Sequence, residues 1–426
     1  MKNKLLAFGA VLLLGVAVWV GLGWRTGVKV EEAVKSWSTP VTAASARSAW
    51  KVMDLKHSRG LFASSGEFHL VYTDAQDSYP FLVAYSVDHK ALPTEAARFS
   101  WLLLPEGPLA VELKSVLGAD LKLTGEGSIA YGGGLVSDIR VPQVSIRRSG
   151  ASWSIVPSTG TVLFDAKRLG LQWKLDKLVM RGHGQAFEVQ GTAVSIDVDN
   201  QAWGKAFAQL AVARIDTSLG TLEGLDLTAE SRRNGDRFDT SVTQSVRKIE
   251  GGGQEFSNLQ IKWELNGLHA ESVEKLVLVA QESGEMKSLT SKERKMAAEA
   301  VETVFSQGFS FGVPTLTGSA KNAGLEGAFT ITVMPAQGAE TALVDRLRST
   351  GKAAVRGALL SPEQREAAAG SGLAVVQGDA LTTSFEYARG VLKVNSRVLD
   401  ATFVDEALAK VDSELQAALN ALKQAR

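Results

Sequence analysis

Two aspartates separated by one residue form the most suggestive pair of side chains for chemistry in this sequence. Asp197 and Asp199 lie in the run DVDNQA, which begins like a calcium-binding loop. Such a loop requires glycine at its sixth position and glutamate at its twelfth, whereas this sequence has Ala202 and Ala208. Residues i and i+2 of a strand share one face, so two solvated carboxylates at a strand end are an alternative interpretation. A third interpretation makes the two aspartates the acid and base of a hydrolase. Both carboxylates would then lie at the same solvated surface, where nothing separates their pKa values.

The histidines do not show the spacing of a metal site. No two of them are three or four residues apart, the separation that places two ligands on one helix face. One lies between glycines in RGHGQ, where a ligand could approach, but a polar turn between two strands accounts for it equally well. The five residues are His57, His69, His89, His183 and His269.

Short serine motifs lack the companions that an enzyme would need. Ser-x-x-Lys occurs at Ser245 with Lys248 and at Ser272 with Lys275, without the S-D-N or K-T-G segments of penicillin-binding enzymes. The sequence contains no phosphate-binding loop and no dinucleotide fingerprint. We therefore predict no catalytic residue, no cofactor-binding residue, no metal ligand and no cofactor.

The composition narrows the class of protein. Its 426 residues include 46 basic and 46 acidic side chains, so no net positive field exists to attract nucleic acid. The absence of cysteine excludes disulfides and thiol chemistry. Hydrophobic residues make up 45% of the chain, which predicts a folded body.

An uncharged segment near the N terminus predicts a membrane anchor. Between Lys4 and Arg25 lie 20 uncharged residues, and a helix of that length spans the ~30 Å hydrocarbon core of a bilayer. A cleaved signal peptide would have a shorter apolar region followed by a small-residue site, whereas this segment ends in Trp24 and Arg25. The basic residues before it favour a cytoplasmic N terminus at residues 1–4, an anchor at 5–24 and an exported C-terminal part.

The rest of the chain divides into a short stalk and a large body. The spacing of Val30, Val34 and Trp37 predicts a stalk helix over 28–37, which ends before Pro40 within a segment spanning 25–49. Residues 50–426 form the exported β-rich body, which could consist of two lobes at 50–280 and 281–426.

From about residue 50 to 280 the apolar residues alternate with polar ones, which predicts strands with one buried face. The pattern is clear in NLQIKWELN at 258–266 and recurs at 171–176 and 194–199. Asn234 and Gly235 predict a two-residue hairpin, whereas the glycine triplets at 132–134 and 251–253 suggest looser connections. Such alternation with short turns predicts antiparallel pairing.

Helices are expected again in the C-terminal part. Thr290 and Glu293 form a capping box for a helix that ends near Gly308, and a second helix runs from Ser361 and Pro362 to Gly370. Strands are expected at 329–333 and 381–394. A last amphipathic helix spans 405–423, and its apolar stripe could either pair two copies of the chain as a homodimer or pack on the sheet. The stripe consists of Leu408, Val411, Leu415, Ala418 and Leu422.

Several stretches resemble the YdgA-like family of bacterial inner-membrane-anchored envelope proteins, whose biochemical function is unassigned. They are the anchor with WRTGVKVEE, HSRGLFASSGEFHLVY at 57–72, LPEGPLA at 104–110 and LTTSFEYARGVLKVNSRV at 381–398. The departures from the family patterns are the additional Ala63, the replacements at Glu106, Leu109 and Ala110, and Ser396 in place of a glycine. The matched glycines and Pro108 also suit turns, so these residues are interpreted as fold determinants.

The resemblance implies the orientation in the inner membrane and a periplasmic β-rich body, and it implies no catalytic residue. We expect an α+β fold dominated by large antiparallel sheet, with amphipathic helices in the C-terminal half and one N-terminal transmembrane helix. A sheet with one apolar face must cover that face or leave it open. A covered face favours a non-enzymatic scaffold that binds an envelope protein partner, and an open face favours binding of a lipid or acyl chain.

Overall fold

The computed structural model describes most of the chain after residue 50. The predicted anchor at 5–24 and the linker at 36–49 lie outside the described residues, whereas 28–32 and 35, in the predicted stalk, are helical. Among the described residues, no helix is both long and apolar enough to cross a bilayer. The described residues are 25, 28–32, 35, 50–73, 77–89, 95–117, 120–132, 134–148, 151–165, 168–182, 185–199, 205–283, 289–337 and 342–424.

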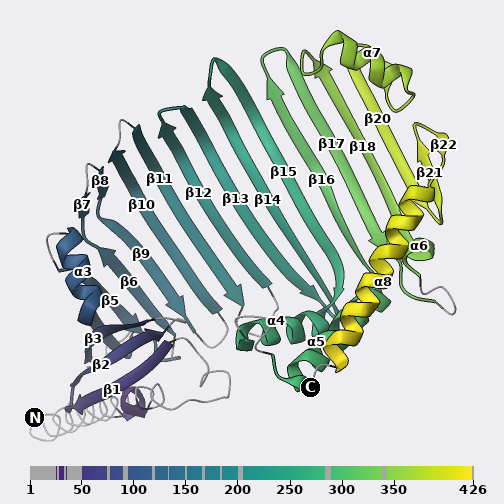
Figure 1. The fold of residues 1–426 in the computed structure, drawn as a ribbon. Helices are drawn as coiled ribbons and strands as arrows, with labels where there is room; N and C mark the ends of the chain where they lie inside the picture. The colour runs from purple at the N-terminus through teal and green to yellow at the C-terminus, as the bar shows by residue number, and fades with distance from the viewer. Residues whose placement is uncertain are drawn as a thin grey trace, which may run out of the picture. The chain divides into compact units, whose positions relative to one another are not determined.

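The chain divides into two compact units, Met1–Asn200 and Gln201–Arg426. The first unit contains an antiparallel sheet and helix α3 (Gly107–Leu117) (Figure 1). Its strand order is β1-β2-β3-β4-β5-β6-β9-β10-β11, and β8 pairs with β10 beyond the end of β9 and carries β7. The strands are β1 (Trp50–Arg59), β2 (Ala63–Thr73), β3 (Ser78–Asp88), β4 (Ala97–Pro105), β5 (Leu123–Ile129), β6 (Leu135–Val141), β7 (Val144–Arg148), β8 (Ala151–Ile155), β9 (Ser158–Phe164), β10 (Arg168–Gly182) and β11 (Gln185–Asp199).

The second unit is also built on antiparallel strands in chain order. β12 to β18 pair each with the next, β20 follows β18, and β19 and β21 share the other edge of β20. The strands are β12 (Lys205–Thr217), β13 (Gly220–Asn234), β14 (Arg237–Gly251), β15 (Gln254–His269), β16 (Phe309–Ala320), β17 (Ala323–Val333), β18 (Leu347–Gly357), β19 (Val375–Gln377), β20 (Ala380–Ala388), β21 (Val391–Val394) and β22 (Arg397–Leu399). The helices are α4 (Ala270–Ser283), α5 (Ser291–Gln307), α6 (Leu343–Arg346), α7 (Pro362–Gly370) and α8 (Thr402–Gln424). The α+β class with a large antiparallel sheet is therefore confirmed.

The hairpins follow from residues that tolerate a left-handed backbone, although two of them differ from the sequence prediction. Asn234 pairs with Arg237, so the loop is Gly235 and Asp236, one residue later than predicted, and only Gly235 has a positive φ of 64°. The triplet at 251–253 is not a loose connection. Gly252 and Gly253, with φ of 59° and 77°, form a tight two-residue turn because both residues of a type I′ loop need positive φ.

The predicted helix ends are confirmed where the signal is local. Thr290 and Glu293 form the capping box of α5, which ends at Gly308 with a φ of 74°, and Ser361 caps α7. The assignment of the whole stretch from 50 to 280 to strands was wrong, because α3 and α4 are helices. Strand β18 was not predicted, since LRSTGKAAVRG lacks the alternation of apolar residues that indicates a strand.

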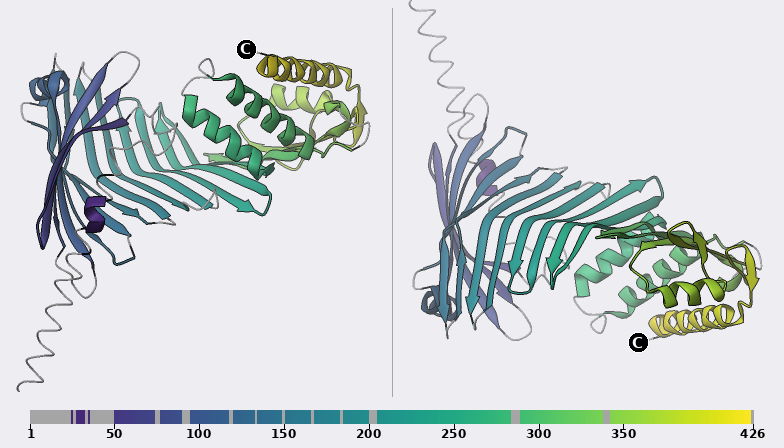
Figure 2. Two further views of the ribbon diagram at one scale, coloured as in Figure 1. Left: turned by 90° about the horizontal axis from the view of Figure 1, so that it is seen from below. Right: turned by 90° about the horizontal axis from the view of Figure 1, so that it is seen from above.

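Helices α4, α5, α6 and α8 of the second unit gather at one end of its strands, whereas α7 lies at the other end, as Figure 1 shows; Figure 2 gives two further views. The buried hydrophobic cluster there consists of Val279, Leu289 and Ala297, between α4 and α5. Helix α8 contacts α5 and α6 rather than lying mainly on the sheet. Leu408, Leu415 and Leu422 of its predicted stripe are half-buried in this packing, whereas Ala418 and Val411 are exposed.

Candidate functional site

The two aspartates singled out in the sequence lie at the C-terminal end of β11 and are half-buried. Arg168 donates to both carboxylate oxygens of Asp197, with 2.7 Å from Nε to Oδ1 and 2.7 Å from Nη2 to Oδ2. Asp199 is opposite Arg168 in the ladder between β10 and β11. The Asp197 carboxylate is therefore bound by an arginine within the sheet.

The four described histidines each make a different polar contact. In the parts of the chain that the structure describes, no three histidine, aspartate or glutamate side chains form a group suited to a metal ion. The contacts pair His57 with Tyr85 (2.8 Å), His69 with both Asp54 (3.2 Å) and Glu106 (3.1 Å), His89 with Ser64 (3.0 Å) and His269 with Ser272 (2.9 Å), and His183 lies outside the described residues.

The lysines of the Ser-x-x-Lys motifs at Ser245 and Ser272 form ion pairs with glutamates. Lys275 lies 2.8 Å from Glu271, and Lys248 lies 3.0 Å from Glu255 and 3.2 Å from Glu250. The hydrogen bonds from Glu255 and Glu250 raise the pKa of Lys248, which stabilises its protonated form. A lysine that activates a serine must instead be neutral, so this arrangement disfavours the nucleophile interpretation.

The residues of the strongest family-like stretch support the backbone of the C-terminal strands. Asn395 accepts a hydrogen bond from the Ser384 backbone N–H at 2.9 Å, and its own N–H donates to the Ser384 carbonyl at 2.9 Å. The Thr383 hydroxyl donates to the Leu373 carbonyl at 2.6 Å. With φ of 48° and 67°, Asn395 and Ser396 form the tight turn between β21 and β22. Their contacts agree with a role in the fold.

The main feature of the second unit is a set of apolar rows that cross its sheet from strand to strand. Residues opposite one another in a ladder lie on the same face, so each row is continuous across several strands. The rows are Leu210, Leu227, Ile261 and Leu316, with the polar Gln244 between Leu227 and Ile261; Val212, Leu225, Val246 and Leu259; and Ile215, Leu222, Ile249, Phe256 and Ala320.

Between the last two rows the strands change their alternation. Leu222 and Leu225 of β13, Val246 and Ile249 of β14, and Phe256 and Leu259 of β15 are each three residues apart. An ordinary strand would place such residues on opposite faces. Gly224 lies within the β13 pair with a φ of 64°, and Asn258 lies within the β15 pair with a φ of 53°. This local distortion turns the side chains that follow toward the same face. A Cβ atom at Gly318 would lie 2.7 Å from Leu259, and Ala320, two residues further along β16, is opposite Phe256, so Phe256 and Leu259 lie on the same face.

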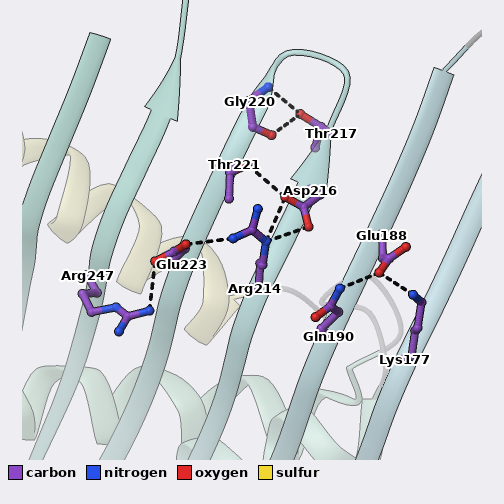
Figure 3. A network of polar contacts seen from close by, with 10 residues as sticks. All are labelled: Lys177, Glu188, Gln190, Arg214, Asp216, Thr217, Gly220, Thr221, Glu223 and Arg247. Atoms are coloured by element: carbon purple, nitrogen blue, oxygen red, sulfur yellow. Dashed lines mark hydrogen bonds and ion pairs between the residues drawn. The ribbon is translucent and has the colours of Figure 1, made fainter. Parts of the chain in front are cut away.

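Charged and polar side chains near the hairpin between β12 and β13 form a network of hydrogen bonds and ion pairs, drawn in Figure 3. Arg214 donates to Asp216 at 2.8 Å and to Glu223 at 2.9 Å, and Arg247 donates to the other oxygen of Glu223 at 2.9 Å. Thr221 donates to Asp216 at 2.9 Å. The charges on these neighbouring strands therefore neutralise one another, while their uncharged neighbours form the apolar rows.

The first unit shows the same arrangement. Leu175 and Leu178 of β10 are three residues apart. The row between them contains Gly191 of β11, whose φ is 63°. Lys177, Glu188 and Gln190 form a polar contact beyond this row, also drawn in Figure 3. Both units therefore keep apolar residues on one face by a left-handed residue within a strand.

Aromatic rings in the first unit lie over glycines of neighbouring strands. A Cβ atom at Gly125 would overlap the ring of Trp101, and one at Gly127 would overlap Phe99. Gly66 and Tyr85 form a third pair, and Gly160 with Trp173 forms a fourth. Glycine permits this close approach and the ring covers the backbone that glycine leaves bare. These pairs add aromatic surface to the apolar face.

Much of the apolar face remains accessible within each unit. In the rows through Leu210 and Ile215, the apolar side chains are half-buried rather than fully buried. In the first unit, Phe164 and Leu169 are 49% and 42% exposed. In the second unit the described contacts of α4 and α5 with the sheet involve β14 and β15, and Figure 2 shows these helices at one end of the strands. The open apolar face is therefore the candidate functional site.

The sequence contains a pattern that indicates this site but that differs from the simple alternation of apolar and polar residues in a strand. Apolar residues three apart with a glycine or asparagine between them, as in LEGL at 222–225 and FSNL at 256–259, mark the positions where the face is preserved. No individual residue of the site was predicted as functional from the sequence.

Comparison with known proteins gives one match. Residues 1–400 match the model of a family described as a bacterial protein of unknown function (DUF945). No curated protein and no solved structure matches the chain.

Proposed function

Because this chain belongs to DUF945, a bacterial family of unknown function, we propose its role from the open apolar face: it binds the acyl chains of lipids. The single observation that supports this role is the set of half-buried apolar rows across β12 to β16. Large exposed apolar surfaces mark binding sites in proteins because water exposure of such area is unfavourable. The proposed role is non-catalytic.

The proposed location is the bacterial inner membrane, with the body in the periplasm. The support is the uncharged segment at 5–24 and the basic residues before it. An anchored protein remains beside its lipid source, so binding would not require diffusion through water. In intact cells an added protease should leave the chain whole, and in spheroplasts it should degrade the body. Degradation of the N terminus instead of the body would contradict this orientation.

Photolabelling of the full-length chain in its membrane tests lipid binding. The cells are grown with a palmitic acid analogue that carries a diazirine near the end of the chain, irradiated, and the protein is digested for mass spectrometry. We expect labelled peptides from β12 to β17 in addition to those of the anchor. Labelling confined to the anchor would contradict the proposal. The Leu227→Gln variant should lower labelling of the sheet, and Thr243→Gln, at a polar position of β14, serves as the matched control.

A scaffold role is the second candidate. Phe403 and Val411 of α8 are 67% and 50% exposed. Exposed apolar side chains on one helix suit a protein partner or a second copy of the chain. Native mass spectrometry of the full-length chain in detergent distinguishes the scaffold role from lipid binding. A dimer that the Phe403→Ser and Val411→Ser double variant abolishes, without bound lipid, would favour the scaffold.

A further inference from the structure

A groove lies on the apolar face near the hairpins that join β14 to β15 and β16 to β17. Its volume is about 360 Å³, within the range of roughly 300 to 1,000 Å³ for small-molecule sites. Its apolar lining comes from four neighbouring strands and from Leu359, which follows β18. The apolar side chains are Val246, Phe256, Leu259, Ile261, Leu316 and Leu325.

The lining contains no charged residue. The polar residues that contribute to it are glutamine, serine and threonine, and Ser257 and Ser319 beside it bond each other at 3.0 Å. A phosphate or carboxylate headgroup would therefore lose its hydration without gaining a cationic partner, which is strongly unfavourable. The occupant of this groove must be uncharged.

The strands also disfavour a peptide as the occupant. The backbone groups of β14 to β17 are largely engaged in the ladders between neighbouring strands, so the floor offers few partners for the N–H and C=O groups of another chain. A buried peptide group without a hydrogen-bond partner is unfavourable, whereas a hydrocarbon chain needs no such partner. A hydrocarbon chain is uncharged and has no group that needs a hydrogen-bond partner, so it suits the groove better than a charged headgroup or a peptide.

We infer that this groove is the subsite for a single acyl chain, with the lipid headgroup left outside it in water. The inference rests on the proposed function and names the place and the part of the lipid that is bound. Gly318 forms part of the floor, and a Cβ atom there would lie 2.7 Å from the Leu259 Cδ2 atom. The absence of a side chain at Gly318 therefore leaves the groove open. Leu359, 41% exposed, forms one rim.

Filling the groove tests this inference. In Gly318→Leu the new side chain would occupy the floor, and the backbone permits it because φ of Gly318 is not positive. The matched control is Gly324→Leu on β17. The new side chain would point to the other face of the sheet, and the atom nearest to the added Cβ would be the Gly318 carbonyl oxygen at 3.9 Å. The full-length variants are photolabelled with the same diazirine analogue, and their melting temperatures are compared.

We expect Gly318→Leu to reduce labelling of the peptides that contain Leu259, Leu316 and Leu325 by at least about tenfold, equivalent to 1.4 kcal/mol of binding. Gly324→Leu should label like the unchanged protein. As a second variant that leaves the strands unaltered, Leu359→Gln should reduce labelling about threefold, equivalent to roughly 0.7 kcal/mol.

The outcomes separate the inference from the proposed function. Labelling of other apolar rows without labelling of the groove would overturn the subsite and leave lipid binding in place. Unchanged groove labelling in both Gly318→Leu and Leu359→Gln would also overturn it. If the unchanged protein is labelled only in its anchor, both the subsite and the proposed function fail.

Discussion

The hydroxyl of Tyr387 in β20 donates a hydrogen bond of 2.7 Å to the carboxylate of Asp405 in α8. Tyr387 is only 3% exposed, so the bond lies at the buried contact between the sheet and its last helix. Gly390, in the turn after β20, lies against the same carboxylate. The contact therefore joins the end of β20 to α8, which packs against α5 and α6.

Removing this hydroxyl should destabilise the second unit. Tyr387→Phe leaves Asp405 without its donor, and we expect a loss of about 1.5–3 kcal/mol of unfolding free energy because the acceptor is charged. Asp405→Asn retains an acceptor oxygen and should lose less. Urea unfolding of the full-length variants measures both effects. Equal losses in the two variants would contradict the role of the hydrogen bond.

The same contact predicts a change of stability at high pH. Burial, and then the hydrogen bond to Asp405, raises the pKa of Tyr387 to about 12 from its ordinary value of 10.0. Between these values the unfolded chain loses a proton that the folded chain retains, so stability should fall as pH rises from 10 to 12. In Tyr387→Phe this part of the decline should be absent. Comparison of the two proteins by urea unfolding at each pH isolates the tyrosine.

The aromatic rings over glycines predict which glycines cannot be replaced. Gly125→Ala would place its Cβ atom against Trp101 and the Asp138 backbone, and we expect a loss of about 1–3 kcal/mol from the forced shift. Gly132→Ala is the control, because no atom lies within 4 Å of the added carbon. Thermal unfolding followed by tryptophan fluorescence reports both. A loss in Gly132→Ala as large as in Gly125→Ala would argue against the ring contact.

His57 predicts a change of stability at mildly acidic pH. Burial lowers the pKa of His57 below its ordinary value of 6.5, although Glu31 opposes this effect. Below pH 6.5 the unfolded chain gains a proton before the folded chain does, so stability should fall as pH decreases toward the folded pKa. His57→Gln should show a flatter dependence between pH 7.5 and 5. An identical pH profile in both proteins would show that His57 does not contribute.

The carboxylates of β11 should contribute little to stability and nothing to calcium binding. The pair of Asp197 and Arg168 is about half exposed, so solvent screens it and Asp197→Asn should leave the midpoint of urea unfolding almost unchanged. Calcium added to the unchanged protein should leave its melting temperature the same. A rise with calcium that Asp197→Asn abolishes would restore the loop interpretation.

Much of the secondary structure could be predicted because its signals are local. The cap at Thr290 and Glu293, the terminator Gly308 and the alternation in β15 depend on residues within one turn or one strand. β18 could not be predicted in this way. Its residues are small or charged, and it is a strand because β17 and β20 pair with both of its edges.

By itself the sequence determined the class of fold, the antiparallel pairing and the amount of apolar surface available to the sheet. It could not determine that Leu222 and Leu225 face the same way, because this depends on the left-handed backbone at Gly224 and on its neighbours across the ladder. Nor could it determine which part of that surface the helices cover. Coverage depends on contacts between elements far apart in the chain, such as Tyr387 with Asp405, and only the tertiary structure decided that the rows near Leu259 and Leu316 stay accessible.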